Sequence, residues 1–147
     1  MPQFAAATKA GGMAQAAPDV CFIPAPAPPA GPGGIPIPFP NIAQFVTASK
    51  TCDKVLIENK PTIVEDSEIP HTQGDEAGCS PLPAPGKGVV SHEIMGKCVF
   101  KTKSGVVFFK GKASVTQTAT TSHNGSNANA PVGTHTVPSQ LKVLVGL

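Results

Sequence analysis

The chain has 147 residues and a net charge of +2, with 15 glycines and 17 prolines but no tryptophan or tyrosine. All eleven basic residues are lysines; because arginine is the preferred two-pronged ligand of phosphates and base edges, nucleic-acid binding is not expected. No apolar run reaches the length of a membrane span, and a secretory signal is not recognisable at the start. The length predicts one domain, residues 1–147, without stable membrane insertion.

The N-terminal quarter is rich in small residues and proline. Residues 1–20 show little periodicity, and residues 24–40 (PAPAPPAGPGGIPIPFP) hold eight of the prolines. Proline fixes φ and lacks an amide donor, which excludes a helix or a central strand here. Two interpretations stay open for this stretch, a polyproline-like surface loop and a ligand for a partner domain. Its end, IPIPFP, fits an extended segment along a sheet edge, and NIAQF (41–45) predicts one helical turn capped by Asn41.

The rest of the chain predicts short strands and long loops. Three β-branched, apolar segments are bounded by turn residues: KVLIEN (54–59), GVVFFKG (105–111) and LKVLVGL (141–147). The first two continue into return strands, with tight turns at Glu58-Asn59 and Lys110-Gly111, where positive φ is tolerated. Residues 74–91 and 124–140 are expected to be loops. No amphipathic helix is recognisable, so the fold class is all-β.

The sequence also repeats itself. Residues 55–73 (VLIENKPTIVEDSEIPHTQ) superimpose without a gap on residues 107–125 (VFFKGKASVTQTATTSHNG), and His71 then falls on His123. Such self-similarity indicates a repeated structural unit.

A third, divided unit would complete the repeat. Residues 143–147 match 55–59, and aligning Cys21 with His71 places Met13 on Ile63 and Ala10 on Lys60. The termini would then meet, and three units would close around a pseudo-threefold axis. Closure would remove exposed strand edges, which an all-β protein has to protect.

This arrangement predicts a metal site at the narrow end. Cys21, His71 and His123 would be equivalent positions near the axis, with His135 as the first candidate for a fourth ligand. Two alternatives for the fourth ligand stay open: His92 and Cys79. A mixed Cys/His set suits Zn²⁺, or iron, better than Ca²⁺ or Mg²⁺. One structural ion, zinc by preference, would compensate for a thin core.

Several segments resemble the PAAR-like proteins. The strings that carry the resemblance are PDVCFIPAP (18–26), IPIPFPNIAQ (35–44), GDEAGCSPLPAPGKGVVSHEIMGKCVF (74–100), TSHNGSN (121–127) and VPSQLKVLV (137–145). The proline–alanine–alanine–arginine signature itself is absent, since Lys112-Ala113-Ser114-Val115 stands at its place.

The resemblance implies a small cone of short β-hairpins with pseudo-threefold symmetry. Such cones cap a trimeric β-helical spike of the valine-glycine-repeat type, one monomer per trimer, in type VI secretion and related phage-tail-like contractile injection systems. They aid envelope puncture and effector delivery. The chain would be made in the bacterial cytoplasm and exported at the tip of the apparatus. PAAR proteins hold one metal by three histidines and one cysteine, which carries over to Cys21, His71, His123 and His135.

Two other functions compete with a spike tip. A metalloenzyme could use Glu93, beside His92, as a base, but the sequence lacks a nucleophile elbow, a phosphate loop and an H-E-x-x-H motif, so we expect no enzyme. A soluble β adaptor could bind a partner through its proline-rich loop. Since the sequence stops at its last predicted strand, any effector cargo is expected to be bound non-covalently.

Overall fold

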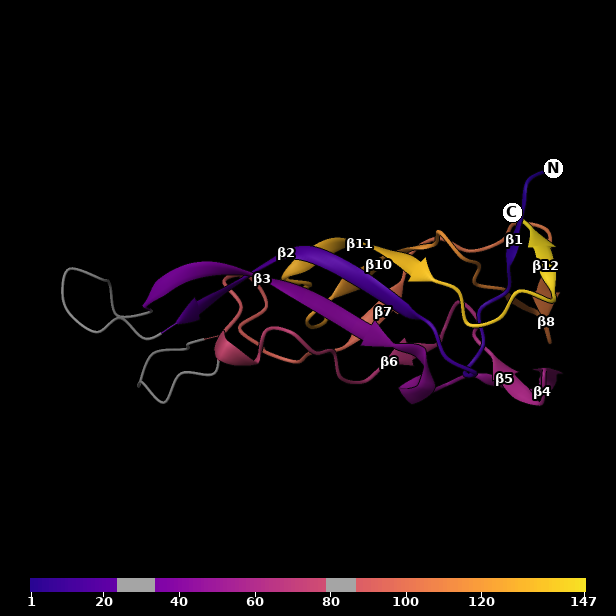
Figure 1. Ribbon diagram of the computed structural model, residues 1–147, viewed down its shortest axis with the longest axis horizontal. Helices are drawn as coiled ribbons and strands as arrows, with labels where there is room; N and C mark the ends of the chain where they lie inside the picture. Colours follow the sequence, from indigo (N-terminus) through magenta and orange to yellow (C-terminus); the bar gives the residue numbers. More distant parts are fainter. Residues whose placement is uncertain (24–33, 79–86) are drawn as a thin grey trace.

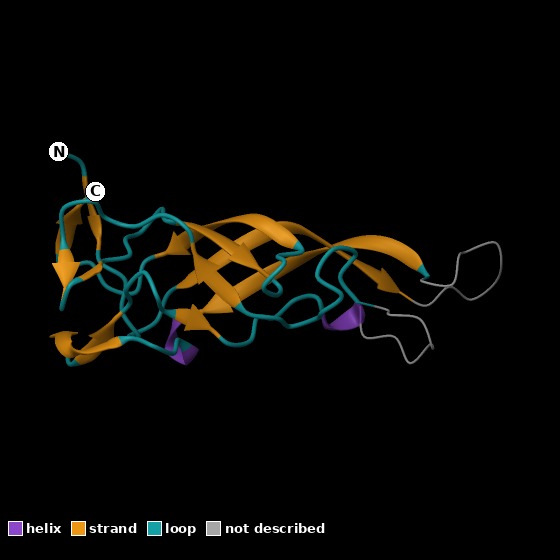
Figure 2. Ribbon diagram, turned by 180° about the vertical axis from the view of Figure 1, so that it is seen from behind, coloured by secondary structure: helices purple, strands orange, loops and turns teal. Residues whose placement is uncertain are grey.

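The computed structural model describes residues 1–23, 34–78 and 87–147, and its regular secondary structure consists almost entirely of strands (Figure 2). The strands are β1 (Gln3–Ala5), β2 (Met13–Ile23), β3 (Ile35–Gln44), β4 (Cys52–Ile57), β5 (Lys60–Thr62), β6 (Glu68–Ile69), β7 (Cys98–Phe100), β8 (Phe108–Phe109), β9 (Lys112–Ala113), β10 (Thr120–His123), β11 (Ala130–Val137) and β12 (Leu144–Gly146). Two 3₁₀ turns accompany them, η1 (Phe45–Thr47) and η2 (Glu76–Gly78). The all-β prediction is confirmed. Among these residues no helix is long and apolar enough to cross a membrane.

Three two-stranded hairpins gather at one end of the elongated molecule, which we call the base (Figure 1). Strands β4 and β5 are joined through Glu58 and Asn59, which have φ of 52° and 60°. Strands β8 and β9 are joined through Lys110 and Gly111, with φ of 52° and 79°. Positive φ at both central residues is the conformation that two-residue hairpins favour, so both predicted turns are confirmed. The third hairpin pairs β1 with β12, and the two chain ends lie together there.

A ring of three hydrogen bonds joins the hairpins around one axis. The amide of Ala7 donates to the carbonyl of Val115 at 2.8 Å, Val115 to Ile63 at 3.2 Å, and Ile63 back to Ala7 at 2.9 Å. The predicted pseudo-threefold closure is therefore confirmed. The predicted alignment of the N-terminal strand is wrong, because Ala7 and not Met13 lies at the position of Ile63 and Val115. Nothing in the alanine-rich start of the chain distinguishes one register from another.

The remaining strands form a sheet that closes on itself. Its order is β3-β2-β11-β10-β7-β6. Beyond β6, Ile42 and Gln73 exchange backbone hydrogen bonds of 2.7 and 2.9 Å, which joins the two ends of the sheet. The prolines of IPIPFP lie in β3 before this closure, where the strand pairs with β2 alone among the described residues, so the edge position predicted from the sequence is confirmed.

Three local predictions need correction. NIAQF does not form a helical turn, because 41–44 pair with β2 and only then does η1 begin. Residues 124–140 are not one loop, since they contain β11. Residues 1–20 hold most of β2, whose buried side chains alternate with exposed ones at its start. The proline-rich stretch 24–33 and residues 79–86, with Cys79, lie outside the described residues.

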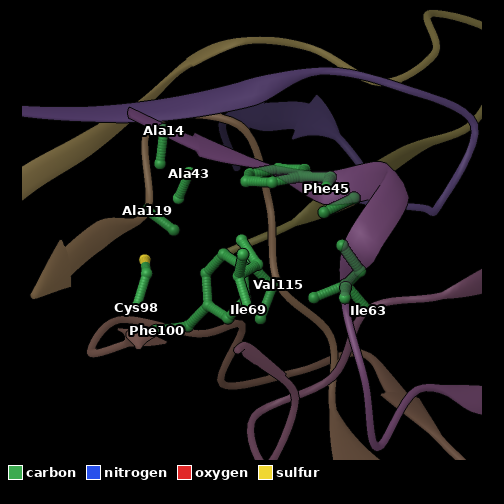
Figure 3. Packing of buried hydrophobic residues seen from close by; sticks show 11 residues of the cluster. Ala14, Ala43, Phe45, Ile63, Ile69, Cys98, Phe100, Val115 and Ala119 are labelled. Atoms are coloured by element: carbon green, nitrogen blue, oxygen red, sulfur yellow. The ribbon is translucent and has the colours of Figure 1, made fainter. Parts of the chain in front are cut away.

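The apolar core sits next to the base and is made largely of small side chains (Figure 3). Its buried members are Ala7, Ala14, Ala43, Phe45, Ala48, Ile63, Ile69, Cys98, Phe100, Val115 and Ala119. The rings of Phe45 and Phe100 pack edge to face with centroids 5.5 Å apart. Away from the base, the buried residues are mostly polar: Asp19, Asn41, Thr72, Asp75, Thr121, Ser122, His123, Asn124 and Asn129. The interior thus changes from apolar to polar along the molecule.

Candidate functional site

The hairpins of the base present two matching sets of side chains. Successive residues of a strand face opposite sides. One set points inward, where Ile57 and Val145 are buried with Ala6 and Phe109 packs against them. The other set consists of the preceding residues, and it is half exposed: Leu56 (52%), Phe108 (55%) and Leu144 (51%).

Leu56, Phe108 and Leu144 are related by the pseudo-threefold axis. Each stands opposite the same position of its return strand, since Leu56 pairs with Pro61, Phe108 with Ala113 and Leu144 with Ala5. One exposed apolar side chain per hairpin gives the base a threefold set of apolar contacts.

The polar interior holds a compact group of possible metal ligands. Ligand atoms of Asp19, Cys21 and Asp75 lie within 4.8 Å of one another, and all three residues are buried. Asp19 and Cys21 are two residues apart on β2, whereas Asp75 immediately precedes η2. We call these three residues the Asp–Cys–Asp group.

Three asparagine side chains clamp Asp19. Asn41 donates to Oδ2 at 2.7 Å, Asn124 donates to Oδ1 at 3.2 Å, and Asn129 also donates to Oδ1. These hydrogen bonds fix the orientation of the Asp19 carboxylate within the polar interior. The same amide nitrogens of Asn124 and Asn129 lie 3.9 and 3.8 Å from the Cys21 sulfur.

The surroundings of Asp75 and Cys21 disfavour their ionised forms. Burial, followed by the charge of Asp19, raises the pKa of Asp75 to about 6, although the amide of Met95 donates to both carboxylate oxygens at 3.1 Å. Burial and the charges of Asp19 and Asp75 raise the pKa of Cys21 to about 12. Without a cation, the thiol therefore keeps its proton.

The Asp–Cys–Asp group fits a divalent cation. Within the described ranges, the ion pairs of the chain join surface lysines to Glu58, Glu65, Asp66 and Glu68, and none reaches Asp19 or Asp75. Two buried carboxylates without a counter-charge cost free energy unless a proton or a cation neutralises them. A bound cation would favour the ionised forms of both carboxyl groups and the thiol. The group can therefore hold a metal ion.

The structure separates the four ligands predicted from the sequence. Cys21 belongs to the Asp–Cys–Asp group, whereas His71, His123 and His135 do not. In the part of the chain that the structure describes, this is the one group of three or more such residues whose ligand atoms lie this close together.

The two buried histidines are engaged by neighbouring oxygens. Nδ1 of His123 lies 2.8 Å from Oδ1 of Asn41, and its Nε2 lies 2.8 Å from Oγ1 of Thr121. Asn41 in turn bonds Asp19, so His123 is linked to the Asp–Cys–Asp group through one amide. Nδ1 of His135 lies 3.0 Å from the carbonyl of Thr116, and its ring packs against Phe45.

The other candidate ligands lie elsewhere. His71 is exposed, and its Nδ1 lies 3.4 Å from the Met95 carbonyl. His92, an alternative fourth ligand, is exposed as well, and Cys79 lies outside the described residues. Cys52 and Cys98 are buried free thiols.

Reasoning from the sequence missed the acidic members of the site. Asp19 stands two residues before Cys21, and this spacing places both on one face of a strand. The signal is present in PDVC but stays hidden as long as residues 1–20 are not recognised as a strand. No local pattern marks Asp75, Asn124 or Asn129, which lie in glycine- and serine-rich segments.

Comparison with known proteins agrees with this architecture. The model of the toxin PAAR-like domain matches residues 12–130, most of the chain. The chain belongs to this family. The matched segment contains the whole Asp–Cys–Asp group, so the centre lies within the PAAR-like domain.

The PAAR-like domain also has a longer curated relative. DNase toxin Tse7 of Pseudomonas aeruginosa is 38% identical over 118 residues, which cover 78% of this chain but only 29% of the toxin. The chain therefore corresponds to less than a third of that relative. No solved structure matches the chain.

Proposed function

We propose that this PAAR-like domain caps and sharpens the trimeric β-helical spike of a type VI secretion or related contractile injection system. The observation that carries the proposal is the threefold set Leu56, Phe108 and Leu144 on the base. A trimeric spike of the valine-glycine-repeat type ends in three identical strands. A single chain complements such an end only if it repeats one contact three times, which the ring through Ala7, Ile63 and Val115 arranges.

Docking would combine apolar burial with strand pairing. Covering a half-exposed leucine or phenylalanine contributes on the order of 1 kcal/mol, and three such contacts act together. The short strands of the base also offer backbone groups for pairing with the spike. The elongated body opposite the base would then lead into the target envelope.

The relationship to a DNase toxin suggests a role in effector delivery, not catalysis by this chain. We propose that this segment delivers effectors and carries no nuclease activity of its own, because it matches only 29% of the length of the DNase toxin and belongs to the PAAR-like family over residues 12–130. Export would take place at the tip of the contractile apparatus, starting from the bacterial cytoplasm.

We further propose that one Zn²⁺ stabilises the end of the molecule away from the base, held by Cys21 together with Asp19 and Asp75. Zinc accepts both thiolate and carboxylate ligands, which makes it a better fit than Mg²⁺ or Ca²⁺. The sequence instead predicts that His71, His123 and His135 hold the ion together with Cys21. Measuring the metal content of variants distinguishes the two ligand sets.

The docking proposal is tested by binding. The variants Leu56→Asp, Phe108→Asp and Leu144→Asp should each weaken co-purification with the trimeric spike protein at least ten-fold, because a charge at the interface loses its hydration. The matched control is Val132→Asp, which changes a 72% exposed apolar residue on β11. Equal binding by all four variants would remove the base as the docking surface.

The metal proposal is tested by metal content. We expect about one zinc per chain by mass spectrometry, lost in Cys21→Ser and Asp75→Asn but kept in His71→Ala and His135→Ala. Loss in the histidine variants, with Asp75→Asn still loaded, would favour the ligand set predicted from the sequence. A folded wild type without metal would contradict both ligand sets.

A further inference from the structure

The three junctions between neighbouring hairpins of the base are built from equivalent residues. Each pairs a residue at or next to the end of β4, β8 or β12 with a residue near the start of another of these three strands. At the first junction Glu58 forms an ion pair of 2.7 Å with Lys142. At the second, Gly146 and Val106 are in contact, since a β-carbon on Gly146 would lie 3.3 Å from Cγ2 of Val106.

The third junction breaks this pattern with two like charges. Lys110 and Lys54 occupy the positions that correspond to Glu58 and Lys142, and together they line a groove of about 310 Å³. Two ammonium groups repel each other, so they do not join the hairpins as the Glu58–Lys142 pair does. Across the described part of the chain, neither lysine forms an ion pair.

The groove combines this positive rim with apolar lining. Phe109 and the buried side chains of Val64 and Cys52 contribute to its walls. Two further lysines line it but are already neutralised: Lys50 pairs with Glu68 at 3.0 Å and Lys112 with Asp66 at 2.9 Å. One acidic residue lines the groove, Asp53, which accepts a hydrogen bond of 3.2 Å from Thr51. The carboxylate of Asp53 offsets part of the positive charge, and the excess that remains comes from Lys54 and Lys110.

We propose that this groove binds an acidic peptide segment of a partner protein. A carboxylate between Lys54 and Lys110 supplies the counter-charge that Glu58 supplies at the first junction, and an adjacent apolar side chain packs on Phe109. Only one of the three junctions has this composition, so the segment binds once per molecule. Binding of this segment would therefore distinguish one side of the base from the other two, which are otherwise nearly equivalent.

The experiment uses the isolated chain and needs no spike, so its outcome is independent of the proposed docking. An amidated peptide of alternating glutamate and leucine is titrated into ¹⁵N-labelled protein, with a lysine–leucine peptide as the reference. We expect saturable, salt-sensitive shifts centred on residues 50–54 and 109–112 with the acidic peptide alone. Shifts that are absent, or spread over all exposed lysines, would overturn the proposal.

Variants of the rim sharpen the test. Lys110→Glu recreates the arrangement of the first junction, with a carboxylate facing Lys54, so it should close the groove and weaken the peptide at least ten-fold without lowering Tm. Lys54→Met, which removes one charge without adding another, should weaken it at least three-fold. The matched control Lys60→Glu has the same charge change on the exposed face of β5 and should stay within two-fold of wild type. Unchanged affinity in both rim variants would contradict the site.

Discussion

The amide of Val115 donates to the carbonyl of Ile63 at 3.2 Å, and these two residues occupy the same position in the two copies of the sequence repeat. Their hydrogen bond is one side of the ring that closes the base. Both side chains are fully buried in the core next to that ring. At this repeat position the backbone therefore holds the hairpins together, and the side chain fills the core.

Truncating this position should destabilise the whole molecule. We expect Ile63→Ala to lower the free energy of unfolding by about 2–5 kcal/mol, because it leaves a cavity where three hairpins meet. Val99→Ala, at a half-buried position of β7, serves as the control and should cost about 1 kcal/mol or less. Chemical denaturation measures both. Equal losses of free energy of unfolding in the two variants would show that the ring position contributes no more to stability than a half-buried strand position.

Removing one of the asparagines that donate to Asp19 should also lower the free energy of unfolding. Asn129 donates to Asp19 and to the carbonyl of Val20, and its Oδ1 accepts from the amide of Val90 at 2.7 Å. Asn129→Ala removes these bonds and leaves the Val90 amide without its acceptor. The expected loss is about 1–3 kcal/mol in the metal-free protein. Asn127, which is exposed and donates to Val90 at 3.4 Å, offers a neighbouring control for which Asn127→Ala should change little. Thermal melts of the apo-proteins decide the matter.

Acid should weaken the fold through His123. Burial lowers the pKa of His123 from 6.5 to about 4. Above pH 6.5 the ring is neutral in both folded and unfolded chains, and its full contribution is present. Between pH 6.5 and about 4 only the unfolded chain takes up the proton, so stability falls, by on the order of 3 kcal/mol in total. In His123→Gln the free energy of unfolding, measured by urea titration, should fall less between pH 6.5 and 4 than in wild type.

Asp75 should act in the opposite direction in the apo-protein. Its pKa is raised from 3.8 to about 6, so its contribution is fully present below pH 3.8 and is lost as the pH rises through 6. Asp75→Asn removes this loss and should raise the apo-protein's stability at pH 7.5 by about 1–3 kcal/mol. The same variant should lose the stabilisation that added zinc gives to wild type. A variant stabilised by zinc as much as wild type would exclude Asp75 as a ligand.

Much of the fold could be predicted because its determinants are local or periodic. Glu58-Asn59 and Lys110-Gly111 specify tight turns by themselves, and the repeat of Ile63 in Val115 reveals the symmetry. The predicted N-terminal register is wrong because Ala7 belongs to a run of alanines that any register fits. The acidic centre was missed because Asp19 and Cys21 lie on β2, Asp75 lies just before η2, and the asparagines that bond Asp19 include two from the segment after β10. No spacing in the sequence brings those segments together.

The pairing of β1 with β12 brings residues near the two ends of the described chain together, which permits circular permutation. Of the three hairpins of the base, this one is held by backbone pairing between the chain ends and by no turn. A short linker from Leu147 to Met1 would supply that turn, and a cut between Glu58 and Asn59 would open another hairpin in its place. Such a circular permutant should fold with nearly unchanged zinc content and Tm.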